Sequence, residues 1–294
     1  MTLTHGRFTI IVTSDLKQFD HIIQLKSGSL YDAHMPHDES EMLVLHQIVR
    51  DAGKRVLELE QQGIDITIKS DQSQVTTADF EVDRILKEQL LSRYPNDGWL
   101  SEETPDDKQR LHNRRVWILD AIDGTRNFIS KIPEYAISLA LVDNHEPVLA
   151  VIFNPAKDEM FSAVKSKGAF LNDQPIHVKT AATDQTTCLI SISPHQQKML
   201  QALAPEITFQ DFGSIAYALA IQASGQVDMT LNPGNQNEWD IAAGVLLVQE
   251  AGGLVQDRDG QPLCFNQPET TTRGVIATHS RIASTTQKLL NALD

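Results

Sequence analysis

The residues best suited to chemistry are two carboxylates, Asp120 and Asp123, that closely follow a short apolar run. This run, residues 116–119, is typical of a buried strand. An unpaired carboxylate at the edge of a core is costly, and hard cations such as Mg²⁺ bind carboxylate oxygens readily. Gly124 and Thr125 follow at an expected helix start, where backbone N–H groups favour a phosphate. The stretch therefore predicts a site for a metal and a phosphate.

Two further acids are placed where they can join this site. Glu102 ends a short strand predicted at residues 98–103, and strand ends gather at one edge of a sheet. Asp240 lies at the start of a predicted helix. Each acid also has a purely structural interpretation. Asp120 and Asp123 can be a helix cap and a turn residue, and Asp240 can be an acid favoured by the helix dipole.

The elements that must position these acids alternate between helix and strand. An amphipathic helix is predicted at residues 39–62, capped by Asp38 or Ser40, and a strand at 64–69. A second helix, with Phe80 among its apolar residues, runs to about residue 94, and a β-meander occupies 135–170. The second half continues with strands at 187–193, 227–231 and 274–278, and helices at 195–203, 214–224, 238–251 and from residue 280. This order predicts an α/β or α+β fold with layered sheets.

Composition narrows the class of partner. The 294 residues carry a net charge of −14, which argues against nucleic-acid polymers and acidic membranes as partners. The negative charge would repel an anionic substrate unless metal ions or local amide groups reverse the local field. Cys188 and Cys264 form no CxxC pattern, so no disulfide framework is predicted and the cytoplasm is the expected compartment. Residues 1–37 show no strong periodicity and are interpreted as an appended N-terminal extension, compatible with poor order.

Three motifs together resemble the inositol monophosphatase family. They are Ser-Glu-Glu at residues 101–103, Leu-Asp-Ala-Ile-Asp-Gly-Thr at 119–125 and Trp-Asp-Ile-Ala-Ala-Gly at 239–244. This superfamily of Mg²⁺-dependent, lithium-sensitive phosphatases includes 3′(2′),5′-bisphosphate nucleotidases and fructose bisphosphatases. The resemblance implies a layered α-β-α-β-α sandwich and a phosphatase domain at residues 38–294, with a metal-site half at 38–184 and a C-terminal half at 185–294. Because homodimers are common in the family, it also implies a homodimer.

The resemblance further implies a role for each acid in binding two to three Mg²⁺ ions. Glu102, Asp120 and the backbone carbonyl of Ile122 would hold the first ion. Asp120, Asp123 and Asp240 would hold the second, with Asp120 bridging, and Glu102 would also help a third, weaker ion.

The same comparison implies the catalytic and phosphate-binding groups. Asp79 and Thr125 match the pair that activates the attacking water, and Gly124 and Thr125 match the backbone donors to the substrate phosphate. Lys69 matches a lysine on a mobile loop, although an ordinary exposed lysine is the alternative. Glu103 is interpreted as a supporting or solvated acid. Trp239 is expected to pack in the fold.

The departures from the family pattern bear on the substrate. Ala121 replaces a proline, which should loosen the turn without removing a ligand. The loop at 232–237 has no acid, whereas typical inositol phosphatases have a glutamate there that contacts inositol hydroxyls. Residues 238–240 and 193–195 look more like the bisphosphate nucleotidases, while Asp-Gly-Thr-Arg-Asn-Phe at 123–128 is closer to the inositol branch.

The sequence thus predicts hydrolysis of a small phosphorylated metabolite by metal-activated water. The substrate is an inositol monophosphate-like compound or, alternatively, 3′-phosphoadenosine 5′-phosphate. A non-catalytic protein that only binds a phosphate ligand is the further alternative.

Overall fold

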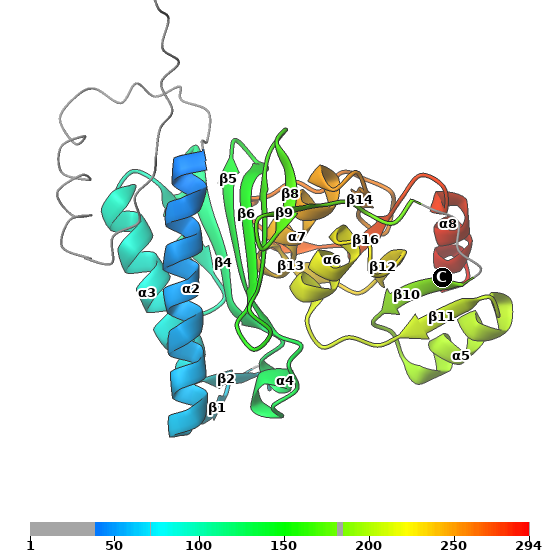
Figure 1. The fold of residues 1–294 in the computed structure, drawn as a ribbon, viewed down its shortest axis with the longest axis horizontal. Helices are drawn as coiled ribbons and strands as arrows, with labels where there is room; N and C mark the ends of the chain where they lie inside the picture. The colour runs from blue at the N-terminus through cyan, green and yellow to red at the C-terminus, as the bar shows by residue number, and fades with distance from the viewer. Residues whose placement is uncertain (1–38, 71, 181–184, 294) are drawn as a thin grey trace, which may run out of the picture. The chain divides into compact units, whose positions relative to one another are not determined.

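The computed structural model describes residues 39–70, 72–180 and 185–293, and these build a stack of alternating helix and sheet layers (Figure 1). Helices α2 and α3 form the first layer, a seven-stranded sheet the second, α6 and α7 the third, a five-stranded sheet the fourth, and α5 and α8 the fifth. The predicted α-β-α-β-α sandwich is confirmed. The predicted extension at residues 1–37 lies outside the described residues.

The helix layers follow the expected amphipathic patterns. Helix α2 buries its apolar residues Leu45, Val49, Ala52 and Val56 against the sheet, as the three- and four-residue spacing predicted. Its proposed capping side chains, at positions 38 and 40, lie outside what the structure describes. The helices are α2 (Glu39–Gln62), α3 (Thr77–Arg93), α4 (Thr125–Ile129), α5 (Pro194–Leu203), α6 (Ile215–Ala223), α7 (Glu238–Glu250) and α8 (Ala283–Asn291).

The seven-stranded sheet has the strand order β3-β4-β5-β6-β7-β8-β9. Strands β3 and β4 are parallel, and the remaining pairs are antiparallel, so the predicted β-meander is confirmed. The strands are β3 (Gly98–Ser101), β4 (Arg115–Asp123), β5 (Ala136–Asp143), β6 (Glu146–Asn154), β7 (Glu159–Val164), β8 (Gly168–Leu171) and β9 (Gln174–Ile176).

Strand β4 is the second strand from one edge of this sheet, and its residues are buried almost throughout. Trp117 and Leu119 face the α2–α3 layer, while Val116 and Ile118 face α6 and α7. Burial on both faces explains the continuous apolar run in the sequence. The strand is longer than predicted, because pairing with β5 continues to Asp123 across a bulge instead of ending before the acids.

The five-stranded sheet has the order β11-β10-β12-β16-β14. Its apolar residues meet α5 and α8 on one face and the α6–α7 layer on the other. The short strands β11 and β14 were not predicted, since each is an isolated segment of four or three residues without a clear alternation. The strands are β10 (Thr186–Ile190), β11 (Ile207–Gln210), β12 (Met229–Asn232), β14 (Leu254–Gln256) and β16 (Val275–Thr278).

Two small ribbons flank the main sheets. Strands β1 (Ile66–Ile68) and β2 (Gln74–Thr76) form a hairpin before α3. Strands β13 (Gln236–Asn237) and β15 (Thr271–Thr272) pair beside the start of α7.

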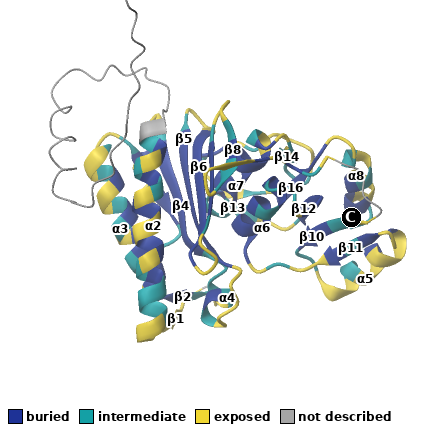
Figure 2. Cartoon of the chain, viewed as in Figure 1, coloured by how far each residue is buried: buried dark blue, intermediate teal, exposed yellow. Residues whose placement is uncertain are grey.

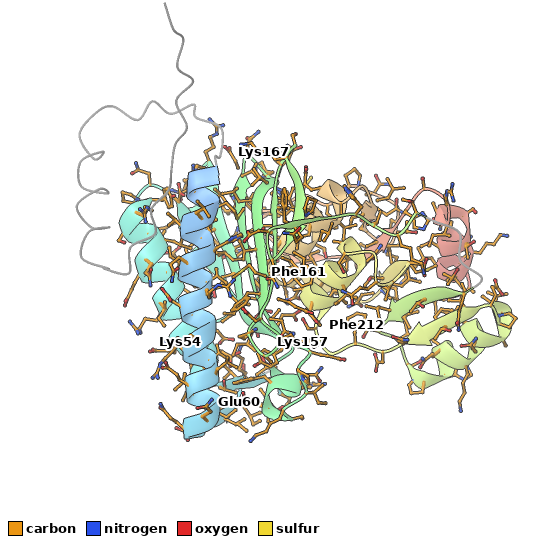
Figure 3. All side chains as sticks on the ribbon, viewed as in Figure 1. Lys54, Glu60, Lys157, Phe161, Lys167 and Phe212 are labelled. Carbon is orange, nitrogen blue, oxygen red and sulfur yellow. The ribbon has the colours of Figure 1, made fainter. Side chains whose placement is uncertain are left out.

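Burial is concentrated in the sheets and in the middle helix layer (Figure 2). Phe161 of β7 packs between the seven-stranded sheet and α6, with its ring centre 6.2 Å from that of Tyr217 (Figure 3). Phe80 of α3 is an exception among the aromatic residues that the structure describes, because 49% of it is exposed. Within the described part of the chain, no helix is long and apolar enough to cross a membrane.

The segment at residues 106–115, predicted as a charged loop, is more ordered than expected. It contains a 3₁₀ helix, η2 (Gln109–His112), and buries Arg110. The guanidinium of Arg110 donates to Asp106, to the side chain of Asn266 at 2.7 Å and to the carbonyl of Gln267 at 3.0 Å. A buried arginine with several acceptors is stable, whereas its sequence context looked like that of a solvated charge.

The close contact of α6 with α7 depends on Gly244. A Cβ atom at this position would lie 2.7 Å from Cβ of Leu219 and 2.5 Å from its Cδ1. We expect Gly244→Ala to lower the free energy of unfolding by about 1–3 kcal/mol, because the helices must separate. Denaturant melts measure this change.

The matched control is Gly234→Ala, where the nearest atom to the new Cβ lies at an ordinary 3.5 Å. We expect the double variant Leu219→Ala/Gly244→Ala to lose less than the two single losses combined. Equal stability of Gly244→Ala and the wild type would contradict the packing argument.

Candidate active site

The bulge at the end of β4 presents the central acids. The register with β5 shifts between Asp120 and Asp123. Asp120 is buried, and its Oδ1 accepts a hydrogen bond from the backbone N–H of Ile122 at 3.0 Å. The two aspartates that sequence analysis identified therefore flank a β-bulge, a feature that is common beside active sites.

Glu102 reaches the same edge of the sheet from the neighbouring strand. Strand β3 runs parallel to β4 with Ser101 beside Leu119, and the N–H of Glu102 donates to the carbonyl of Leu119 at 3.3 Å. Glu102 and Asp120 therefore follow paired residues of adjacent strands. The expectation that Glu102 and Asp120 lie on neighbouring strands is confirmed, although β4 continues past Asp120 to Asp123.

Lys69 of the β1–β2 hairpin is an ion-pair partner at this edge. Its Nζ lies 2.8 Å from Oε1 of Glu102 and 2.7 Å from Oε1 of Glu103. The side chain of Glu103 is only 4% exposed, so it is a buried acid and not a solvated one. Burial raises the pKa of Glu103 to about 7, although the hydrogen bond from Lys69 acts in the opposite direction.

Asp79 and Thr125 are brought together from α3 and α4. The hydroxyl of Thr125 lies 3.3 Å from Oδ1 of Asp79 and 3.0 Å from the carbonyl oxygen of Ile122, and it can donate to either. Asp79 Oδ2 accepts from the backbone N–H and the hydroxyl of Thr76, which makes a capping box at the start of α3. Burial raises the pKa of Asp79 to about 6.

Asp123 is held by partners that sequence reasoning missed. Its Oδ2 accepts from the hydroxyl of Ser214 at 2.5 Å and from the N–H of Ala216 at 2.6 Å, both at the start of α6. The sequence did indicate a helix start after Gly213-Ser214, where free N–H groups favour an anion. It carried no signal that this helix meets an acid some ninety residues earlier in the chain.

Asp240 occupies the third position of α7. Its Oδ2 accepts from the N–H of Asn237 at 2.8 Å in a second capping box. The interpretation of Asp240 as an acid in the first turn of a helix is therefore confirmed. Burial first, and then the charge of Asp123, raise the pKa of Asp240, and the charge of Asp240 contributes in turn to the raised pKa of Asp120.

Gly124 connects β4 to α4 in a conformation that suits glycine. Its φ is +91°, and a Cβ there would lie 3.0 Å from the carbonyl oxygen of Glu134 and from Cβ of Ser214. The predicted helix start at Thr125 is confirmed. Asn127, in the first turn, lies against Gly213, because a Cβ on Gly213 would come within 1.8 Å of its Nδ2.

Negative charge is crowded around Asp120. Burial first, and then the charges of Glu102, Asp123, Asp240 and Asp79, raise the pKa of Asp120 well above its usual value. Burial also raises the pKa of Asp123 to about 7. Such a cluster of carboxylates favours a cation.

The donor set fits Mg²⁺ in its chemistry, since it offers carboxylate oxygens and the Ile122 carbonyl. Over residues 39–70, 72–180 and 185–293, however, no three His, Cys, Asp or Glu side chains stand together in an arrangement that could hold a metal ion. The acids are bound instead to Lys69, Ser214 and backbone N–H groups. These partners use one carboxylate oxygen of each acid, namely Oε1 of Glu102, Oδ2 of Asp123 and Oδ2 of Asp240, so a metal would bind through the other oxygen or displace the partner.

Comparison with known proteins gives the class of this fold and site. The family model for the inositol monophosphatase family matches residues 38–293. The chain is 35% identical to the inositol-1-monophosphatase of Rhizobium meliloti over 228 residues, 74% of this chain and 85% of the relative. It is 30% identical to the 3′(2′),5′-bisphosphate nucleotidase CysQ of Escherichia coli K12 over 232 residues, 76% of this chain and 93% of the relative.

A solved structure gives the same result. The inositol monophosphatase of Thermotoga maritima superposes with a TM-score of 0.76 and 28% identity, covering 86% of this chain and 97% of that one. The fold and its acid-rich site define a phosphoric monoester hydrolase. The chain belongs to the inositol monophosphatase family.

The raised pKa values predict how stability depends on pH. The carboxyls of Asp79, Glu103 and Asp123 have pKa values of about 6 to 7 in the fold, above their ordinary values near 4. The folded chain therefore binds more protons than the unfolded chain. We expect the melting temperature in EDTA to fall as pH rises from 5 to 8, and Mg²⁺ to raise it more at pH 8 than at pH 5.

Calorimetry at several pH values measures both effects. Asp120→Asn should flatten the pH dependence, because it removes the buried charge that the other four acids surround. Glu206→Gln, at an exposed position far along the chain, is the matched control and should leave the slope unchanged. A melting temperature that rises from pH 5 to pH 8 would contradict the charge-crowding argument.

Proposed function

We propose that this phosphatase hydrolyses a small phosphate monoester by direct attack of water, with two to three Mg²⁺ ions held by Glu102, Asp120, Asp123, Asp240 and the carbonyl of Ile122. The observation that carries the proposal is the crowding of these acids beside a hydroxyl–carboxylate pair, Thr125 and Asp79. When bound, the ions would cancel phosphate charge, lower the pKa of water and stabilise the leaving oxygen.

The Thr125 hydroxyl and the Asp79 carboxylate are assigned to proton transfer. With a pKa of about 6, Asp79 is mostly ionised at neutral pH and yet remains basic enough to accept a proton. The capping box with Thr76 fixes its second oxygen, Oδ2, so Oδ1 faces Thr125. In this role, Thr125 orients the attacking water and passes its proton to Asp79.

The phosphate group is assigned to the turn between β4 and α4. The backbone N–H groups of Gly124 and Thr125 would donate to its oxygens, which holds an anion without adding further charge to the site. The left-handed conformation of Gly124 supports this role, because it turns the chain sharply from β4 into α4.

The substrate is a small phosphorylated metabolite. Relatives are named for two kinds of substrate, inositol monophosphates and nucleoside bisphosphates. An inositol monophosphate-like compound is the first substrate to test, and 3′-phosphoadenosine 5′-phosphate is the alternative. The loop at 232–237 contains no acid, which supports keeping the alternative.

Asp120→Asn is the first test of this proposal. We expect the rate of phosphate release from inositol 1-phosphate or 3′-phosphoadenosine 5′-phosphate to fall by about 10³-fold or more, because the central charge among the metal ligands is lost. EDTA should abolish the wild-type activity and Mg²⁺ should restore it. Circular dichroism checks that the variant remains folded, and Glu206→Gln should keep full activity.

Full activity of Asp120→Asn, or of the wild type in excess EDTA, would overturn the proposed mechanism. If the protein binds these phosphates with no turnover under any metal condition, it is a phosphate-binding protein instead.

The proton-transfer pair is tested separately. We expect Asp79→Asn and Thr125→Ala each to lower kcat by about 10²- to 10⁴-fold. The double variant should lose little more than the worse single variant, because the two groups act as a unit. The wild-type rate should decline below about pH 6 as Asp79 becomes protonated, and Asp79→Asn should lack this limb. Fully additive losses would contradict the pairing.

A further inference from the structure

A cavity of about 460 Å³ opens beside the acid cluster. This is within the usual size range for a small-molecule site. Glu102 borders both the cavity and the predicted metal site, so a molecule bound through a phosphate at the site could extend into this space. The residues that line it include Lys69, Phe80, Glu102, Glu103, Trp239 and Thr270.

Two aromatic side chains form part of the cavity wall. Each is the chain neighbour of a site acid, because Phe80 follows Asp79 and Trp239 precedes Asp240. The two rings therefore come from the starts of two different helices, α3 and α7. Their positions tie the aromatic wall closely to the groups assigned to catalysis.

Phe80 is not one of the residues that pack α3 against the sheet. The buried residues of α3 are Ala78, Asp79, Val82, Asp83, Leu86 and Leu90, and Phe80 lies outside this stripe with 49% of its surface exposed. Trp239 packs on the central core cluster, as the sequence predicted, while it also borders the cavity. A single exposed aromatic residue is ordinary, but two that line one cavity at an active site form a surface for a flat apolar group.

We propose that this cavity binds the base of a nucleotide whose phosphate occupies the catalytic site, and that Phe80 is the residue that favours such substrates by stacking on the base. This inference rests on the proposed phosphatase function. A purine has two flat apolar faces, and stacking on an aromatic side chain adds strongly to binding. An inositol ring carries a hydroxyl on every carbon that is not phosphorylated. It therefore gains less binding free energy from contact with the same aromatic side chains.

Two substrates with different leaving groups test the inference. Adenosine 2′-monophosphate and inositol 1-phosphate both carry a phosphate on a secondary ring hydroxyl, and only the first has a base. We expect Phe80→Ala to lower the ratio of kcat/KM for adenosine 2′-monophosphate to that for inositol 1-phosphate by about tenfold, mainly through KM. Phe80→Trp, which keeps a stacking surface, should retain the ratio.

Leu43→Ala is the matched control, because Leu43 is a large apolar residue of α2 that is 68% exposed and does not line the cavity. Its ratio should equal that of the wild type. An unchanged ratio in Phe80→Ala, or equal losses for both substrates, would overturn the inference and leave the proposed function intact.

If the wild type releases phosphate from neither compound and also not from 3′-phosphoadenosine 5′-phosphate, the proposed function fails and binding decides the inference. Calorimetric titration with adenosine 2′-monophosphate then compares the wild type with Phe80→Ala. Weaker binding by about tenfold in the variant supports the base site, and equal binding overturns it.

Discussion

The structure is constrained above all by the repulsion between carboxylates at the end of β4. Asp120 is buried among four other acids, and its burial, together with their charges, raises its pKa. Hydrogen bonds from the protein offset part of this repulsion. Three helices contribute backbone N–H groups, since α3 begins with the capping box of Asp79, α6 donates to Asp123 and α7 begins with the capping box of Asp240. The layered fold lets three helix starts from two layers meet one strand end.

This arrangement separates two tasks that the same acids perform. As caps and hydrogen-bond acceptors, Asp79, Asp123 and Asp240 hold helix starts in place without any cation. As a group of like charges, the same acids favour the binding of a cation. The ion pair of Lys69 with Glu102 and Glu103 fits this picture, because it places a positive charge at the edge of the cluster.

Much of the fold followed from local patterns in the sequence. The long amphipathic helix α2 and the meander were predictable because their periodicity is strong, and the meeting of Glu102 with Asp120 followed from the geometry of parallel strand ends. Contacts between distant segments were not predictable. Ser214 and Ala216 bind Asp123 across some ninety residues, and Arg110 is buried by acceptors more than 150 residues away. The exposure of Phe80 could also not be predicted, since it depends on which face of α3 packs against the sheet.

The buried Arg110 has a mechanical consequence for the cavity. Its guanidinium binds the segment at Asn266 and Gln267, whose N–H groups in turn donate to Glu238 in the first turn of α7. The segment after β3 and the start of α7, which both contribute residues to the cavity wall, are thereby cross-linked. The hairpin that carries Lys69 is not part of this brace. We therefore expect a loss of the Arg110 contacts to change the shape of the cavity on the side of α7 more than on the side of the hairpin.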